Sequence, residues 1–226
     1  MYYDNMMTGI FHLRPNRFIA IVEIDGCLET CHVKNTGRCR ELLIPGVQVY
    51  VQKSDNPSRK TRFSVIGVKK EKRIINMDSQ APNKAVKEWL LGGGLFKDIT
   101  YLKPEKTYGN SRFDFYIETR EEKIYMEVKG VTLEEDGIVL FPDAPTERGI
   151  KHIKELCRCK REGFQAYLIF VIQMKEVEYF KPNDTTSPEF GEALREAAEQ
   201  GVYILARDCQ VTMDSMEIRD EVPIRL

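Results

Sequence analysis

Three side chains in the second half of the chain have the types and spacing of a hydrolytic site that binds a divalent metal ion. Asp114 lies within residues 112–119 (RFDFYIET), while Glu127 and Lys129 lie two residues apart within residues 123–131 (KIYMEVKGV). Both segments alternate in polarity as strands do, so Glu127 and Lys129 are expected on one face of a sheet. If the two strands form a hairpin, we expect Asp114 almost opposite Lys129 on that same face.

These residue types suit hydrolysis of a phosphodiester. Two neighbouring carboxylates can hold Mg²⁺ or Mn²⁺, and such a cation lowers the pKa of a bound water and stabilises charge on a phosphate. The lysine can orient the nucleophile or neutralise an oxyanion. An Asp followed by Glu-x-Lys on the next strand resembles the PD-(D/E)xK phosphodiesterase core. A surface ion pair has the same spacing, but Met126, Val128 and Val131 make this strand apolar, which favours the catalytic interpretation.

The first part of the chain is predicted to be a small β-barrel. Short strands with turn signals between them, such as Asp25-Gly26 and Pro45-Gly46, run from Arg17 to Phe63. Regular short strands without intervening helices fit an OB-like barrel. We assign this nucleic-acid-binding barrel to residues 1–80.

The remainder, residues 81–226, alternates between helices and strands. The expected helices cover 82–91, 143–161 and 188–200, with Asp143 as the cap of the second, and the expected strands cover 112–119, 123–131, 166–173 and 202–206. This order is an α/β arrangement, or α+β for the whole chain, with at least one crossover. The expected fold is therefore an N-terminal OB-like β-barrel followed by a PD-(D/E)xK nuclease-like mixed-sheet domain with flanking helices.

Charge and hydropathy limit the class of partner. The chain has 34 Lys or Arg and 35 Asp or Glu, a net charge of -1, so attraction to a polyanion must come from local patches. Residues 1–80 hold 13 basic and 8 acidic side chains, a balance of +5, which favours this part for contact with nucleic acid. The sequence shows neither a signal-peptide pattern nor an apolar run of eighteen residues, so we expect a cytoplasmic protein without a membrane partner.

Five segments together resemble the sugar fermentation stimulation protein A family nearly end to end. They are RPNRF at 14–18, NTGR at 35–38, SRFDF at 111–115, EVKGVTL at 127–133 and FPDAPTERGIKHIKEL at 141–156. The resemblance implies an OB-like barrel fused to a PD-(D/E)xK-like domain that binds DNA, with nuclease activity inferred from the fold. It also implies that Asp114, Glu127 and Lys129 fill the core positions and that Glu105 is an additional metal-binding carboxylate. The alternative for Glu105 is a solvated loop glutamate.

Further side chains are candidates for contact with nucleic acid. They are Arg17, Asn35, Arg38 and Arg62 in the barrel, and Arg112, Arg148, His152 and Gln173 in the second domain. Arginines interleaved with aromatic residues suit a barrel that stacks bases and binds phosphates. The alternatives are a solvated surface for the barrel residues, an exposed charged helix face for Arg148 and His152, and a strand end in water for Gln173.

The leading hypothesis is a DNA-binding protein with a metal-dependent phosphodiesterase site that uses Mg²⁺ or Mn²⁺. A second hypothesis is a non-cleaving DNA-binding regulator, linked to sugar metabolism, that retains the nuclease fold, and a third is a sensor of a sugar or nucleotide. The two carboxylates and the lysine favour the enzyme, because a pure binder does not need an acidic pair that faces phosphate without a cation. The sequence leaves open whether the partner is DNA or RNA, single or double stranded, and whether the chain forms a homodimer.

Overall fold

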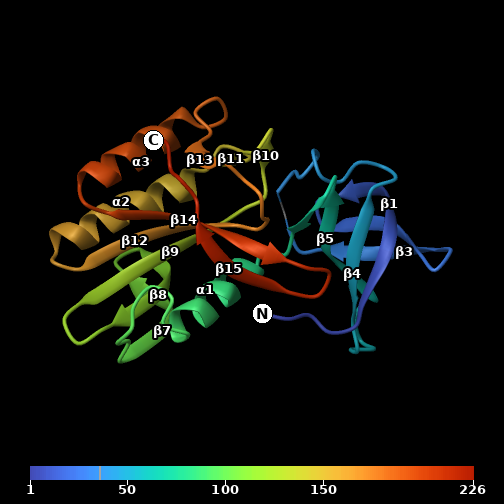
Figure 1. Ribbon diagram of the computed structural model, residues 1–226, viewed down its shortest axis with the longest axis horizontal. Coiled ribbons are helices and arrows are strands. Elements are labelled where there is room, and N and C mark those ends of the chain that lie inside the picture. The colour runs from blue at the N-terminus through green and yellow to red at the C-terminus, as the bar shows by residue number, and fades with distance from the viewer. Residues whose placement is uncertain (36) are drawn as a thin grey trace.

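The computed structural model describes residues 1–35 and 37–226, and it shows two domains side by side (Figure 1). The strands of the first domain are β1 (Met6–Asn16), β2 (Ile19–Ile24), β3 (Cys27–Val33), β4 (Gln48–Lys53), β5 (Phe63–Lys70) and β6 (Arg73–Asn76). They are ordered β3-β2-β1-β4-β5, and a parallel pairing between β3 and β5 closes a five-stranded barrel, which β6 extends. The expected OB-like barrel is confirmed.

The barrel is held together by alternating side chains on its strands. On β2, Ala20, Val22 and Ile24 are buried while the residues between them are partly exposed, as expected for a sheet with one face toward a core. Gly9 of β1 lets β1 and β2 approach closely, since a Cβ at this position would lie 2.5 Å from Val22 Cγ1 of β2.

The second domain is a mixed six-stranded sheet, ordered β15-β14-β12-β9-β8-β7, with helices on both faces (Figure 1). Its main elements are α1 (Ala81–Leu91), β7 (Tyr101–Tyr108), β8 (Ser111–Glu118), β9 (Lys123–Val131), α2 (Glu147–Arg161), β12 (Gln165–Ile172), α3 (Pro188–Glu199), β14 (Tyr203–Val211) and β15 (Met216–Glu221). A smaller sheet contains β10 (Glu134–Glu135), β11 (Ile138–Phe141) and β13 (Tyr179–Pro182). Strand β12 is parallel to β9 and to β14, and α2 and α3 are the two crossover helices. The predicted mixed sheet with flanking helices is confirmed.

One local expectation was wrong, and one strand was not predicted. Helix α2 begins at Glu147, and its cap is Thr146, whose hydroxyl accepts a hydrogen bond from the backbone N–H of Gly149 at 3.0 Å. Asp143 therefore does not cap the helix, because Pro145 disfavours a helical conformation for the residue before it. Strand β7 was not predicted, since Pro104 interrupts its pattern; at the edge of the sheet a proline is tolerated.

Apolar side chains form two clusters on the two faces of the second sheet. One lies under α2 and α3 and includes Leu156, Phe170 and Phe190, and it is continuous with the interior of the barrel. The other lies under α1 and includes Val86 and Met126. Apolar clusters thus cover strand β9 on both sides, so Glu127 and Lys129 lie in mostly apolar surroundings. Among the described residues, no helix is long and apolar enough to cross a membrane.

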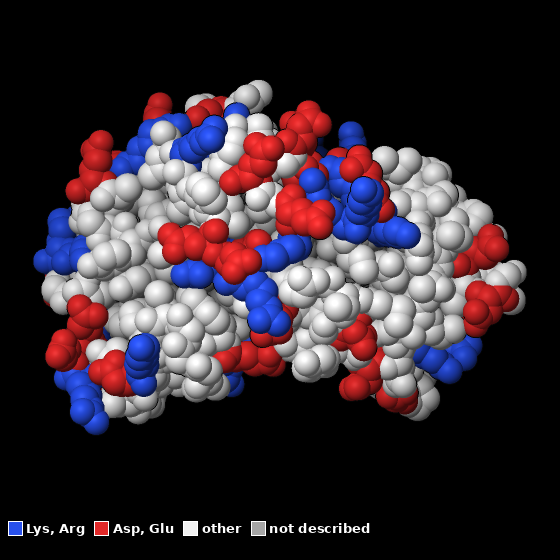
Figure 2. Space-filling view, viewed as in Figure 1, with Lys and Arg blue, Asp and Glu red and all other residues white. Residues whose placement is uncertain are grey.

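The two domains are joined by a buried ionic contact. Glu134 of β10 is 3% exposed, and its carboxylate lies 2.7 Å from Lys70 Nζ and 2.6 Å from Arg73 Nη1 of the barrel. Figure 2 shows basic and acidic side chains gathered at this junction, near β5 and β10. Burial alone would raise the pKa of Glu134, but hydrogen bonds from Lys70, Arg73 and the Gly137 N–H outweigh burial and lower the pKa to about 2.

Replacing Glu134 with glutamine is expected to lower the free energy of unfolding by about 1 to 3 kcal/mol at neutral pH, because two half-buried cationic partners lose their buried counter-charge. The folded-state pKa of the carboxyl is depressed from 4.5 to about 2, so its contribution is full above about pH 5 and is lost as the pH falls toward 2. Urea denaturation at both ends of this range measures the difference. Glu135→Gln, at an exposed neighbour, is the control, and a Glu134→Gln effect that is independent of pH would contradict the assignment.

Candidate active site

The carboxylate of Asp114 lies where the pairing between β8 and β9 ends. Phe115 and Met126 are the last paired residues, and next to them Asp114 replaces a backbone partner. Its Oδ2 accepts a hydrogen bond from the Val128 N–H at 2.7 Å, and its Oδ1 accepts one from Asn83 Nδ2 of α1 at 2.8 Å. Both carboxylate oxygens are therefore held in place, one by a backbone N–H of β9 and the other by a side chain of α1.

Glu127 and Lys129 lie together on the side of β9 that faces α2. Glu127 Oε1 accepts a hydrogen bond from Lys129 Nζ at 2.6 Å and a second from Nδ1 of His152 on α2. One step beyond the last pair of the ladder places Asp114 beside Glu127, whereas the sequence predicted a position opposite Lys129. The hairpin is offset from the predicted register, and the two carboxylates are neighbours.

One oxygen of this network has no partner. Glu127 is 3% exposed, and its Oε2 is buried without a hydrogen bond to any described residue. A buried carboxylate oxygen without a donor is costly, and such exceptions often mark a missing ion or water. Glu127 Oε2 is therefore the atom most suited to accept a cation.

The two carboxylates differ in their acidity. Burial, together with the negative charge of Glu127, raises the pKa of Asp114 to about 6. Burial alone would also raise the pKa of Glu127, but the hydrogen bonds and charges of His152 and Lys129 outweigh it and leave this pKa lowered. At neutral pH two carboxylates whose negative charges repel each other are therefore held in a poorly solvated place, and a divalent cation would relieve their repulsion.

A divalent ion fits this arrangement through the two carboxylates. Within the described parts of the chain, no group of three or more His, Cys, Asp or Glu side chains is arranged to hold a metal ion. Asp114 and Glu127 would therefore supply the protein ligands, and water would fill the other positions, as is usual for Mg²⁺. Lys129 stands beside the pair, where an ammonium group can act on a phosphate or on a nucleophilic water.

Glu105 does not join this pair. It lies on β7 in a left-handed conformation, with φ of 55°, its side chain is 66% exposed, and its carboxylate lies 3.5 Å from Arg112 Nη1. An ion pair in solvent occupies both Glu105 and Arg112. The structure thus gives the predicted third carboxylate a surface position, and Arg112 is exposed next to it.

Two predicted contact residues of the second domain have different surroundings. Arg148 is exposed on the first turn of α2, where a phosphate can reach it. Gln173 is only 2% exposed, and its Nε2 donates to the backbone oxygens of Asn76 and Asp78. The expectation that Gln173 reaches substrate is wrong, because its amide fastens the segment that links the two domains.

The barrel candidates lie in two places. Arg17, Asn35 and Arg38 lie close together, because the guanidinium of Arg14 donates hydrogen bonds of 2.7 to 2.9 Å to backbone oxygens of all three and of Gly37.

Arg62 is elsewhere on the barrel. It stacks on Phe63, with 5.3 Å from its guanidinium carbon to the ring centroid, and its Nη1 lies 4.0 Å from Glu29. The predicted group of arginines is therefore divided, with Arg17 and Arg38 in one place and Arg62 in another.

A cleft between the domains leads to the end of β9. It has a volume of about 380 Å³ and is lined by Asn35 and Gly37 of the barrel, by the segment 130–133 and by the segment 140–146 before α2. Gly130 in this lining directly follows Lys129. The cleft therefore connects the barrel loop to the strand that carries the acidic and basic side chains.

Two residues that position the site are not among those predicted from the sequence. Asn83 orients Asp114, and Arg14 holds the loop that forms one wall of the cleft. For Asn83 the available signal was a polar amide in the first turn of an otherwise apolar helix face. For Arg14 it was only the resemblance of its segment, since no spacing rule predicts a guanidinium bonded to four carbonyls.

The fold and the site together define a class of protein: an OB-like barrel followed by a PD-(D/E)xK-like mixed-sheet domain with an acidic pair and a lysine on its central hairpin. Residues 13–77 match the family described as the SfsA N-terminal OB domain, and residues 80–215 match the sugar fermentation stimulation protein RE domain. The chain belongs to the sugar fermentation stimulation protein family.

Similar proteins cover the whole chain. Sugar fermentation stimulation protein homologs of Clostridium beijerinckii and Ruminiclostridium cellulolyticum are each 63% identical over 226 residues, which is 100% of both chains compared. The solved structure of SfsA from Pyrococcus furiosus, described as a complex with Ca²⁺, is 31% identical, with a TM-score of 0.91 over 100% of this chain and 98% of that one.

Proposed function

We propose that this protein is a metal-dependent phosphodiesterase that acts on nucleic acid, with DNA as the expected substrate and Mg²⁺ or Mn²⁺ as the expected cofactor. The observation that carries the proposal is the convergence of Asp114, Glu127 and Lys129 where β8 and β9 separate, with an unpartnered, buried oxygen on Glu127. A surface ion pair would have no reason to be buried or to include two repelling carboxylates.

The similar structure supports a cation in this family. The Pyrococcus furiosus relative is described as a complex with Ca²⁺, an ion that takes oxygen ligands as Mg²⁺ does. In the present chain, Asp114 and Glu127 would hold the divalent ion. When bound, the ion supplies a more acidic water and positive charge for the phosphate.

The protein's own residues then have separate roles. Asn83 and the Val128 N–H fix the Asp114 carboxylate, and His152 fixes Glu127. Lys129 places a positive charge beside the reacting phosphate, where it can neutralise the developing charge on oxygen. The nucleic-acid strand would enter along the cleft that Gly130 lines.

The direct test incubates the purified protein with labelled single- and double-stranded DNA and RNA, in Mn²⁺ or in EDTA. We expect cleavage in Mn²⁺ that is absent in EDTA, abolished in Asp114→Ala and strongly slowed in Lys129→Ala, while both variants still bind the oligonucleotide. Cleavage at the wild-type rate in the two variants would come from a contaminant and would remove support for the enzyme.

A second candidate function is a DNA-binding regulator that does not cleave, linked to sugar metabolism as the relatives' name describes. It is favoured by the scarcity of ligands, because the described residues contain no group of three or more His, Cys, Asp or Glu side chains arranged to hold a metal ion. Binding of DNA by the wild type, with no turnover in either Mg²⁺ or Mn²⁺, would support this candidate.

Replacing His152 with alanine is expected to weaken metal-dependent cleavage by about 10- to 100-fold, because Glu127 loses the group that orients it. The half-saturating concentration of Mn²⁺ should rise, which a purely structural role would not cause. His152→Asn, which keeps a donor, should recover part of the activity, and Lys154→Ala on the exposed side of α2 is the control. An unchanged Mn²⁺ dependence in His152→Ala would contradict this role.

A further inference from the structure

Four arginines of the barrel surround a hollow that is separate from the carboxylate pair. The hollow has a volume of about 420 Å³, and its lining includes Arg14, Arg17, Arg38 and Arg40 together with Asn16. Arginine binds phosphate in a planar, two-pronged manner, so a group of this kind is a place for a phosphate.

The arginines divide into one that builds the hollow and three that can meet a ligand. Arg14 uses its guanidinium for four backbone carbonyl groups. Arg17, Arg38 and Arg40 are exposed, and within the described residues none of them forms an ion pair. Glu41 is the acidic residue next to them in the chain, and it is half-buried. The exposed side of the hollow is therefore positively charged.

An aromatic ring stands next to this charge. Phe18 is 44% exposed, and the guanidinium carbon of Arg17 lies 4.8 Å from its ring centroid. The Phe18 N–H donates to Asn16 Oδ1, which holds the short turn in place. An exposed ring fixed beside arginines is an arrangement that stacks an unpaired base while its phosphate is neutralised.

The hollow adjoins the interdomain cleft. Gly37 lines both the arginine hollow and the interdomain cleft, and the cleft reaches Gly130, next to Lys129. Each space is of the size that holds a small ligand, and the two in succession suit a flexible strand more than a rigid duplex. A duplex would also keep its bases stacked on one another, which leaves none for Phe18.

We propose that the arginine hollow and Phe18 bind the single-stranded part of the nucleic-acid substrate, with a backbone phosphate among Arg17, Arg38 and Arg40 and an unpaired base on Phe18. This inference rests on the proposed nuclease function and assigns its substrate class. The strand then passes through the interdomain cleft to Asp114, Glu127 and Lys129.

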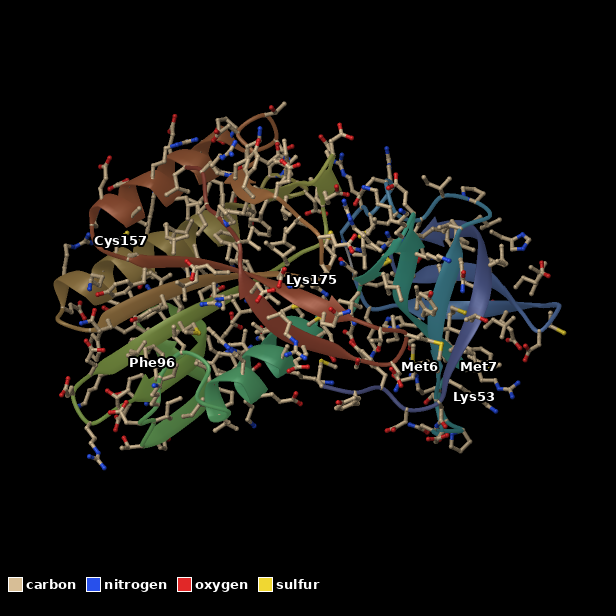
Figure 3. The ribbon with its side chains drawn as sticks, in the orientation of Figure 1. Met6, Met7, Lys53, Phe96, Cys157 and Lys175 are labelled. Carbon is tan, nitrogen blue, oxygen red and sulfur yellow. The ribbon has the colours of Figure 1, made fainter. Side chains whose placement is uncertain are left out.

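The test measures binding of matched single-stranded and duplex DNA in EDTA, so that no cleavage is required. Phe18→Leu should weaken single-strand binding by roughly five- to one-hundredfold and change duplex binding little, while Phe18→Tyr should retain it. Arg38→Ala should lower the slope of log affinity against log salt by about 0.7 for single strands. The control is Lys53→Ala, which removes a charge from the far end of β4, beside Met6 and Met7 (Figure 3).

Equal losses for both DNA forms in Phe18→Leu, or an Arg38→Ala effect no larger than that of Lys53→Ala, would overturn the inference. Displacement of the oligonucleotide by inorganic phosphate at the same concentration as by a single strand would also overturn it, since the hollow would then be a site for free phosphate. If these variants behave as expected but no cleavage occurs in Mn²⁺, the nuclease proposal fails while the single-strand site stands. If cleavage occurs but neither Phe18→Leu nor Arg38→Ala weakens single-strand binding, the single-strand site is wrong while the nuclease proposal stands.

Discussion

Replacing Lys129 with alanine is expected to lower the rate of metal-dependent cleavage by about 100- to 1,000-fold, the usual effect of removing one group that stabilises transition-state charge. Lys129 is part of the carboxylate network, with its Nζ 2.6 Å from Glu127 Oε1. Binding of the uncleaved oligonucleotide should change little, because one phosphate contact among several is lost. Single-turnover rates in Mn²⁺, measured beside binding in EDTA, separate the two effects.

The matched control is Lys123→Ala. Lys123 is exposed on the same strand but at its other end, where it pairs in the ladder with Glu118. Lys123→Ala is expected to cleave at the wild-type rate. Similar activity in Lys129→Ala and Lys123→Ala would show that the lysine has no role in the reaction.

Replacing Asp114 with asparagine is expected to stabilise the metal-free protein while it abolishes cleavage. Burial and the charge of Glu127 raise the pKa of Asp114 from 3.8 to about 6. The folded state therefore holds the proton more tightly than the unfolded chain, and keeping Asp114 ionised at neutral pH costs about 1 to 3 kcal/mol. The asparagine lacks this charge, so Tm in EDTA should rise by roughly 2 to 10 °C.

The pH dependence identifies the cause of this gain. As the pH falls below about 6, wild-type Asp114 takes up its proton in the folded state, so the advantage of Asp114→Asn should shrink toward pH 4 and vanish below it. Added Mn²⁺ should stabilise the wild type but not the variant. Asp4→Asn, at an exposed position, serves as the control. A lower Tm for Asp114→Asn than for the wild type at neutral pH would contradict the prediction that burial and the charge of Glu127 make an ionised Asp114 destabilising.

The part of the site that the sequence predicts is the part that strand periodicity determines. Residues two apart on a strand share a face, so the grouping of Glu127 with Lys129 follows from the alternation in 123–131. The neighbouring strand with Asp114 follows from the same pattern. Register does not follow, because the turn between the strands sets it, and the observed pairing of Phe115 with Met126 brings Asp114 to Glu127.

The side chains that position the carboxylates come from the helices, and strand periodicity does not predict them. Asn83 reaches Asp114 from α1, and His152 reaches Glu127 from α2, which depends on how the helices pack on the sheet. Gln173 follows the end of β12, and burial against the interdomain segment gives it a structural role. Glu105 was predicted as a metal-binding carboxylate, but its side chain lies in solvent next to Arg112.

The most direct measurement is anomalous diffraction from crystals of the protein soaked in Mn²⁺. We expect a peak within roughly 2.0 to 2.6 Å of an oxygen of Asp114 and an oxygen of Glu127, as for oxygen-ligated divalent ions, and no such peak in Asp114→Asn. Crystals that take up Mn²⁺ elsewhere, with none between these two carboxylates, would contradict the proposal that they form a metal-dependent active site.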